Sequence, residues 1–441
     1  MGPRQRRRAI FESEGKDRMI KQLCKALSAA KSITDWLINE TTTHSTQAFY
    51  VMQKLETTRL ADTREYSVTV YKEFSDKGVA YTGSSSFVLS HKLSNADLNK
   101  KIEEAAFAAS LIKNKRFDLV PGTAKRTWKE KPFGHEPLVL LDKIAGVFFK
   151  EAKENLRFNS LELFHTTSTI RVVSSKGVDY KKTMHRVNIE AIPSYDGADD
   201  KVELYRYLTY SKIDFDVLRA DAKAALSDVT NRYAAKAIKE IAKIDVILRD
   251  EDVKSLFESL IEDYSYDSVY RKNTDKVICD AIQKDVTGEY LDLNLKPSSK
   301  ADGFDRDGVL LSPTNIIEKG VITNYYGSNQ YAQYLSLKPS GLLATIAVGK
   351  GKTSYERMKK KPHLEIIALS GIQIDMYSHY IGGEVRLAVY FDGKKYHPVS
   401  GFSFSGNIEK CLSALVMSKE TTVLQGYEGP KYILLKNMEI L

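Results

Sequence analysis

The residues best suited to bind a metal ion stand singly along this chain. Of its eight histidines and three cysteines, no two histidines have helical i, i+4 spacing and no two cysteines form a CxxC pair. Zinc sites need clustered nitrogen and sulfur ligands, so each residue taken alone is expected to be a surface or packed side chain. One alternative stays open, in which His363, His379 or His397 converge with a carboxylate around a C-terminal sheet.

Short motifs of catalytic and nucleotide-binding proteins are incomplete here. The run Gly351-Lys352-Thr353 ends like a phosphate-binding loop, but Ile346 occupies the position of the opening glycine. His135-Glu136 begins like a zinc-protease motif, but the proline that follows would break the required helix. The segment Asp302–Gly308 resembles a calcium loop but lacks the glutamate at the twelfth position, so we expect a structural turn there.

The composition indicates a globular protein without a membrane span. The 441 residues are 42% hydrophobic and 28% charged, and no apolar run reaches the about 18 residues that would cross a bilayer. The first eight residues are basic but lack the apolar stretch of a secretory signal, so we expect a cytoplasmic protein. The net charge of +9 could attract nucleic acid, but acidic and basic residues are interspersed, and a nucleic-acid partner is not expected.

Hydrophobic periodicity predicts an α+β fold. Residues 1–120 and 121–244 are expected to form mixed α/β regions with antiparallel sheets and long helices, and residues 245–441 a β-rich antiparallel domain. The expected elements of the first two regions are a helix over 17–39, a strand over 47–55, a hairpin turn at Ser75–Gly78, a helix capped by Ser94, a linker over 121–137, a helix over 139–155, a hairpin turn at 175–177 and a long helix over 218–241. In the third region only 251–264 is convincingly helical.

Several C-terminal segments are similar in amino-acid sequence to those of a known family. Two alternating stretches, which begin at Tyr380, flank Asp392-Gly393 as a predicted hairpin and continue to Asn407. Together with 269–272, 303–309, 316–322 and 371–375, this run resembles the TldD/PmbA family, once called modulators of DNA gyrase and now viewed as a zinc-peptidase system. The resemblance covers most of the chain, strongly after residue 245 and weakly before 120.

The resemblance implies where a zinc motif would stand. The catalytic branch of the family carries HExxxH on a helix early in its C-terminal domain, with a cysteine near the C-terminus as a further ligand. The matching helix is 252–263, where Glu258 and Asp263 replace the two histidines and Ser259 replaces the glutamate that serves as base. The loop 424–430, which would hold the cysteine, has none. We therefore expect no catalytic residue and no bound metal in this chain.

This pattern resembles the PmbA (TldE) branch, which lacks HExxxH. It implies a non-catalytic, metal-free subunit of a peptidase complex that acts on unfolded or extended peptides, with zinc only in a TldD-like catalytic partner. The expected assembly is a heterodimer with that partner, or a homodimer when the chain is alone. Two alternatives stay open: an active metallopeptidase with non-standard ligands, such as His363, His379 or His397, and a gyrase-associated or nucleic-acid-binding protein. The carboxylates of Glu258, Glu262 and Asp263 are more often a solvated stripe than ligands, and Ser259 beside them could not act as the base.

Overall fold

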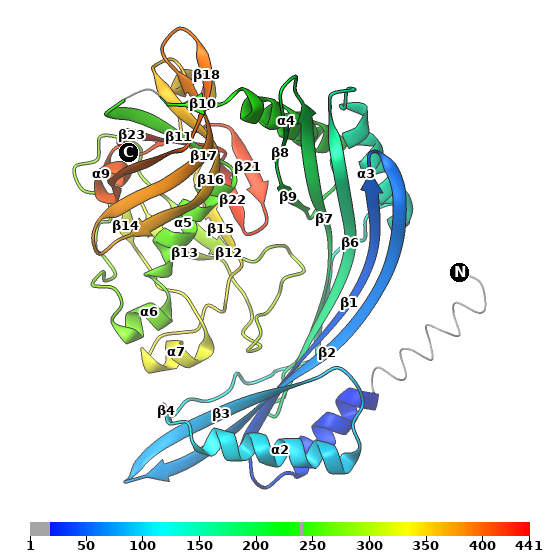
Figure 1. Ribbon diagram of the computed structural model, residues 1–441. Helices are drawn as coiled ribbons and strands as arrows, with labels where there is room; N and C mark the ends of the chain where they lie inside the picture. Colours follow the sequence, from blue (N-terminus) through cyan, green and yellow to red (C-terminus); the bar gives the residue numbers. More distant parts are fainter. Residues whose placement is uncertain (1–17, 239–240) are drawn as a thin grey trace.

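The computed structural model describes residues 18–238 and 241–441. It has a long curved sheet, built from the first half of the chain, and a more compact C-terminal unit that lies on one side of it (Figure 1). Helices and antiparallel sheets both contribute, and the C-terminal unit is rich in strands, which confirms the predicted α+β class. Among the described residues, no helix combines the length and the apolar character needed to cross a bilayer.

The curved sheet has nine strands and joins both N-terminal regions. Its order is β4-β3-β2-β1-β6-β7-β5, with β8 and β9 also paired to β7. Because β1 pairs with β6 from Leu37↔Ser174 to Val51↔Ser160, strands from either side of residue 121 belong to one sheet. The strands are β1 (Asp35–Val51), β2 (Lys54–Asp76), β3 (Val79–Leu89), β4 (Asn114–Lys115), β5 (Arg126–Lys129), β6 (Leu156–Ser174), β7 (Asp179–Asp196), β8 (Lys201–Glu203) and β9 (Arg206–Tyr210). The division into domains at residues 121 and 245 stays a prediction.

Helices cover one face of this sheet at both of its ends. A helix over 18–29 and α2 (Asn95–Ser110) bury the alternate residues Trp36 and Ile38 of β1. Farther along the same strand, α3 (Pro137–Lys150) and α4 (Phe215–Ala234) bury Ala48 and Tyr50. Since side chains two apart point to the same face of a strand, all four helices lie on one side. The opposite face is left for the C-terminal unit.

The C-terminal unit contains a closed ring of strands. β16 pairs with β17, β17 with β19, β19 with β23, β23 with β11, and β11 returns to β16 as a parallel neighbour. The strands of the ring are β11 (Lys243–Arg249), β16 (His363–Asp375), β17 (Tyr380–Phe391), β19 (Phe402–Asn407) and β23 (Tyr432–Ile440). Three further strands pair with it: β18 (Tyr396–Ser400) with β17, β10 (Lys236–Ala237) with β18, and β20 (Val416–Met417) with β23. The hairpin predicted around Asp392-Gly393 is confirmed as β17 and β18.

A second, six-stranded sheet and short helices complete this unit. Its order is β14-β13-β12-β15-β22-β21, formed by β12 (Leu293–Lys296), β13 (Thr314–Glu318), β14 (Val321–Ile322), β15 (Thr345–Val348), β21 (Thr421–Leu424) and β22 (Tyr427–Pro430). The helices are α5 (Glu251–Glu262), α6 (Tyr266–Arg271), α7 (Asn329–Tyr334), α8 (Tyr355–Met358) and α9 (Ile408–Ser413). One hydrophobic core joins α5 to both sheets.

Several predicted element boundaries are wrong, among them that of the helix expected over 139–155, since α3 ends at Lys150. The described part of the 17–39 helix ends at residue 29 and β1 begins at Asp35, because apolar residues there alternate as a strand; residue 17 lies outside the described residues. The strand predicted over 47–55 is interrupted by a turn at Met52 and Gln53, both with positive φ. The long helix predicted to reach residue 241 ends at Ala234. In contrast, the turn at Ser75–Gly78 and the Ser94 cap are confirmed.

Candidate functional site

Helix α5 is the element on which the zinc motif of the resembled family would stand. Its inner residues Val253, Leu256, Phe257, Leu260 and Ile261 are buried in the core between the two C-terminal sheets. This spacing of three and four residues places them on one helical stripe. The outer stripe carries Glu251, Lys254, Glu258 and Glu262, so the expected two-faced helix is confirmed.

Glu258 lies on the outer stripe and takes part in a surface ion pair. Its carboxylate is 3.7 Å from Nζ of Lys254, one helical turn earlier, and its side chain is 48% exposed. Lys254 also donates to Glu251 at 3.1 Å. An exposed pair of this kind is screened by water and contributes little to stability. Ser259, the next residue, is only half-buried.

Asp263 ends the helix in a different environment from Glu258. It is half-buried at the C-cap of α5. Burial raises the pKa of its carboxyl group, and the negative charge of Glu262 adds to the effect. The helix C-terminus, which carries partial negative charge, would not attract a carboxylate. Asp263 is therefore a poorly placed anion rather than a preformed metal ligand.

The three positions do not form a metal site. Glu258 is engaged by Lys254 on the exposed face, whereas Asp263 lies half-buried at the C-cap of the helix. Among the residues that the structure describes, no three His, Cys, Asp or Glu side chains are grouped so as to hold a metal ion. The loop after β21 does approach α5, because a Cβ on Gly426 would lie 3.7 Å from Cε of Lys254. This loop contributes no thiol, so the residues present do not fit zinc.

The histidines of the alternative site lie apart, each with its own surroundings. His363 is 1% exposed, with Nδ1 2.8 Å from the carbonyl of Lys361. His379 has a positive φ and faces Glu409 at 3.5 Å. His397 lies 2.9 Å from Asp392 at the exposed tip of the β17–β18 hairpin. The structure therefore does not bring these three side chains together.

A buried ion pair that sequence reasoning missed joins the C-terminal unit to the curved sheet. Lys182 of β7 donates to Asp302 Oδ1 at 2.6 Å and to the carbonyl of Phe304 at 2.7 Å. The Phe304 ring is fully buried against Trp128 and Tyr180. Asp302 and Lys182 are 120 residues apart, so no local pattern could reveal the contact. The segment 302–308 is thus a structural turn, as predicted, and it also docks two regions.

Asp305 stabilises this turn from within. Its Oδ1 accepts from the backbone N–H groups of Asp307 at 2.9 Å and Val309 at 3.0 Å, and Oδ2 accepts from Leu342 N–H at 3.0 Å. Burial nevertheless raises the pKa of Asp305, since the three hydrogen bonds only partly offset the loss of water. The carboxylate therefore fixes the shape of the loop.

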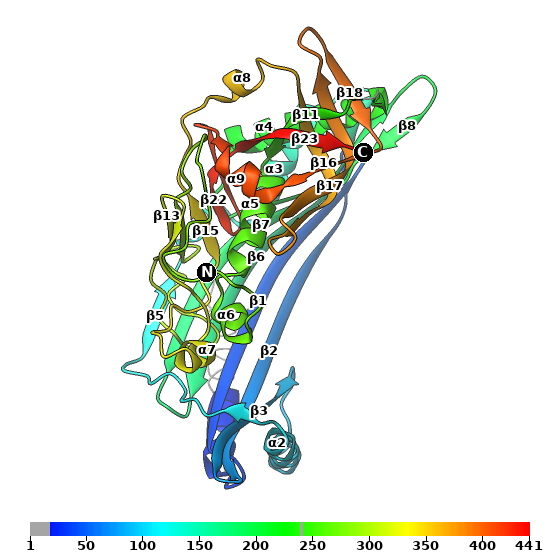
Figure 2. The same cartoon turned by 90° about the vertical axis from the view of Figure 1, so that its left-hand side faces the viewer.

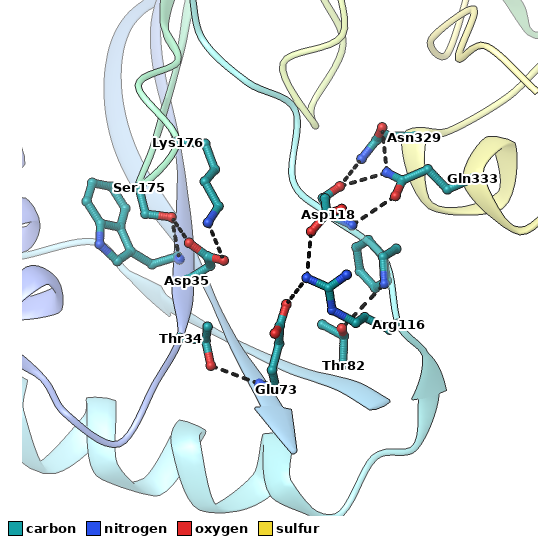
Figure 3. Close-up of polar contacts among 12 residues, drawn as sticks. Thr34, Asp35, Glu73, Thr82, Arg116, Asp118, Ser175, Lys176, Asn329 and Gln333 are labelled. Carbon is teal, nitrogen blue, oxygen red and sulfur yellow. Dashed lines mark hydrogen bonds and ion pairs between the residues drawn. The ribbon is translucent and has the colours of Figure 1, made fainter. Parts of the chain in front are cut away.

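A second polar contact links α7 to the segment after β4 (Figure 3). The side-chain amide of Gln333 pairs with Asp118 as a backbone strand would: Asp118 N–H donates to Oε1 at 2.9 Å, and Nε2 donates to the Asp118 carbonyl at 2.7 Å. Asn329 donates to the same carbonyl at 2.8 Å. Arg116 lies between Glu73 and Asp118, at 3.3 and 3.1 Å. The C-terminal unit is therefore fastened to the curved sheet at two places.

A cavity of 680 Å³ lies between the strands β8 and β9 and the strand ring of the C-terminal unit. Arg206, Arg232 and Arg386 line it together with Glu203 and Glu384, so charges of both signs face the space. Arg386 donates to Ser370 at 2.8 Å, while Arg206 is held by the buried Asp228 at 2.9 Å. Leu204, Leu369, Val385 and Leu387 line it as well, so the cavity combines apolar walls with a few charged groups.

Comparison with known proteins agrees with this architecture. The family model described as PmbA/TldA metallopeptidase C-terminal domain matches residues 241–441. A relative named Metalloprotease PmbA, from Escherichia coli O157:H7, is 28% identical over 180 residues, which are 38% of this chain and only 39% of that relative's length.

Solved structures share nearly the whole fold. The crystal structure of TldE from Thermococcus kodakarensis aligns with a TM-score of 0.76 at 15% identity and covers 96% of this chain and 99% of its own. A proposed modulator of DNA gyrase from Bacteroides thetaiotaomicron VPI-5482 aligns with a TM-score of 0.75 at 16% identity and covers 97% and 98%. At these identities the likeness shows the fold alone.

The strand ring, the six-stranded sheet and the α5 helix between them are the C-terminal domain of a metallopeptidase-related protein. Residues 241–441 of the chain therefore belong to the TldD/PmbA family.

Proposed function

We propose that this chain is a non-catalytic, metal-free subunit of a TldD/PmbA-type zinc metallopeptidase complex in the cytoplasm. Its partner is a TldD-like subunit that bears HExxxH and holds the zinc. The complex acts on unfolded or extended peptides, and this chain completes the enclosed space and positions the peptide.

One observation carries the proposal: the outer face of α5 lacks a ligand set. Glu258 is engaged with Lys254, Ser259 has no group able to take a proton from water at neutral pH, and Asp263 lies at the helix end. A zinc peptidase needs a metal-bound water and a base beside it. An ammonium group on this face opposes the binding of a cation, since Lys254 lies beside the position that would hold the first ligand.

The remaining architecture suits a positioning subunit. The cavity between β8–β9 and the strand ring offers charged and backbone groups to an extended chain. Backbone pairing with a strand edge would bind such a chain without regard to its sequence. This chain therefore contributes contacts along the peptide, while bond cleavage takes place in the partner.

Metal analysis and reconstitution test the proposal. The purified chain should hold no stoichiometric zinc and should not cut an unfolded protein such as casein, whereas mixing it with an HExxxH-bearing partner should raise the cleavage rate above that of the partner alone. Glu258→Ala should leave that rate unchanged, because the residue is not a ligand. Stoichiometric zinc with cleavage by this chain alone would overturn the proposal, as would loss of the reconstituted activity in Glu258→Ala.

A further inference from the structure

The cavity between β8–β9 and the strand ring contains two arginines that no carboxylate of the described chain engages. Arg232 lies in the last turn of α4, which packs against β17 and β18, and Arg386 lies on β17 itself. Both views place α4, β8 and β18 at the end of the molecule away from α2 (Figure 1, Figure 2). Among the described residues, neither arginine forms an ion pair. The cavity therefore has positive charge available for a ligand.

Ser370 orients Arg386 and leaves the outer edge of its guanidinium group free. Nε of Arg386 donates to Oγ of Ser370 at 2.8 Å. Within the described chain, the N–H groups on Nη1 and Nη2 have no acceptor. These groups form a planar fork that matches the two oxygens of a carboxylate. Arg206 differs, because it already donates to Asp228 at 2.9 Å.

A free carboxylate lies beside this cation. Glu384 also lines the cavity, and it has no ion pair in the part of the chain that the structure describes. It stands two residues before Arg386 on β17, so the two side chains leave the same face of the strand about 6.6 Å apart. Glu203, in contrast, pairs with Lys201 at 3.2 Å. The free groups suit a ligand that carries a carboxylate together with N–H donors.

Apolar side chains form the rest of the wall. Leu204, Leu369, Val385 and Leu387 line the cavity between the charged groups. Its volume of 680 Å³ lies within the range of about 300–1,000 Å³ that is usual for sites of organic ligands. An apolar group next to the carboxylate of a ligand would be removed from water against these residues, which favours binding.

We propose that this cavity binds the C-terminal end of a peptide whose last residue is apolar. The terminal carboxylate accepts from Arg386, while Arg232 adds positive charge, and the last side chain packs against the apolar wall. Glu384 accepts from a backbone N–H near the end of the peptide, since an extended chain advances about 3.3 Å per residue. The choice of a peptide rests on the proposed function, whereas the need for a carboxylate and an apolar group rests on the cavity.

Fluorescence anisotropy of the purified wild-type chain tests the recognition of the carboxylate. The probe is a tetrapeptide of three alanines and a C-terminal leucine, labelled with fluorescein at its N-terminus. Its free acid should bind at least about tenfold more tightly than the same labelled peptide with a C-terminal amide, because the amide lacks the charge that Arg386 binds. Octanoate is an apolar carboxylate without N–H groups, so it should displace the probe less effectively than the unlabelled peptide acid.

Substitution of Arg386 tests the location of the site. Arg386→Gln should weaken binding of the free acid by about tenfold or more and remove the difference between acid and amide. The side chain is exposed, so the fold should tolerate the change. Arg357→Gln is the matched control, because it removes the same charge from an exposed position on α8 outside the cavity. It should bind the free acid as the wild type does.

Three outcomes would overturn the proposal. One is a free acid that does not bind or binds no better than the amide. Another is binding by Arg386→Gln equal to that of the wild type. The third is octanoate that displaces the probe as well as the peptide acid, which would make the cavity a site for organic acids. These measurements need neither zinc nor cleavage, so each of these outcomes would leave the metal-free role of α5 standing.

Discussion

Replacing Lys182 by methionine should weaken the attachment of the C-terminal unit to the curved sheet. Lys182→Met keeps most of the side-chain volume but removes the cation that faces Asp302, and both partners are about nine-tenths buried. Breaking a buried ion pair costs about 3–5 kcal/mol, since one charge is left without a partner. Asp302 would still accept from Ser298 N–H at 3.0 Å and from Ser298 Oγ–H at 2.9 Å. We therefore expect about 3 kcal/mol, the lower end of that range.

The pH dependence of this loss identifies its cause. Burial tends to raise the pKa of Asp302, but the hydrogen bond and charge of Lys182 outweigh it and hold that pKa below its usual value. A depressed pKa contributes stability above the unfolded-state value, and this stability is lost as the pH falls through the folded pKa. In Lys182→Met, burial without the cation raises the pKa of Asp302. As the pH falls, Asp302 is therefore protonated earlier in the variant than in the wild type, and the cost of its unpaired buried charge disappears. The loss in free energy of unfolding relative to the wild type should be largest at pH 7 and should shrink as the pH falls below about 5.

Urea unfolding followed by tryptophan fluorescence measures the effect, because Trp128 packs on Phe304 beside the ion pair. Free energies of unfolding for the wild type and the variant should be compared at pH 7.5 and at pH 4. Lys181→Met, on the neighbouring exposed residue, is the matched control and should change stability by less than about 0.5 kcal/mol. The reasoning is refuted if the deficit of Lys182→Met at pH 7.5 is below about 1 kcal/mol or if it grows as the pH falls.

Three further substitutions test other contacts. Burial raises the pKa of Asp252 to about 6, so its ionisation costs up to about 3 kcal/mol at neutral pH. Asp252→Asn should therefore raise the free energy of unfolding above pH 6 and leave it unchanged near pH 4. Equal effects at both pH values would contradict this. Gln333→Ala should remove two hydrogen bonds to Asp118, about 1–3 kcal/mol in all; hydrogen exchange of the Asp118 amide should quicken, and unaltered protection would count against the contact. Gly303→Ala would place a Cβ 2.2 Å from the Trp128 ring; a urea midpoint equal to that of the wild type would show that the loop yields there.

Local features of the fold could be predicted from the sequence. Lys77 and Gly78 have positive φ in the turn between β2 and β3, as the Ser75–Gly78 signature indicates. Ser94 Oγ accepts from Asp97 N–H at 3.1 Å, as its N-cap position predicts. Both features depend on residues within four positions of each other. The α5 helix was predictable for the same reason, since its apolar residues recur at intervals of three and four positions.

Longer-range features could not be predicted in this way. The run Thr41–Thr46 is polar throughout and lacks the apolar alternation that indicates a half-buried strand, yet it continues β1 because β2 and β6 pair with it on both sides. Hydrogen bonding to neighbours, rather than local preference, decides such a segment. The Lys182–Asp302 pair depends on the docking of two regions far apart in sequence. For the candidate site, sequence reasoning identified the helix and its outer residues, and the i, i+4 spacing of Lys254 and Glu258 is the only local signal of their ion pair.

The two faces of α5 separate the residues that stabilise the fold from the positions at which the zinc motif of the resembled family would stand. Its inner residues join the two C-terminal sheets, and Phe257 stacks on Tyr427 of β22 with ring centroids 6.1 Å apart. Truncating a buried aromatic residue such as Phe257 costs about 3–5 kcal/mol, whereas exchanging an exposed outer residue costs little. Outer positions such as Glu258 and Ser259 can therefore carry ligands or solvated side chains on the same scaffold. The outer side chains of α5 can therefore vary with little effect on the fold, whereas its inner side chains cannot.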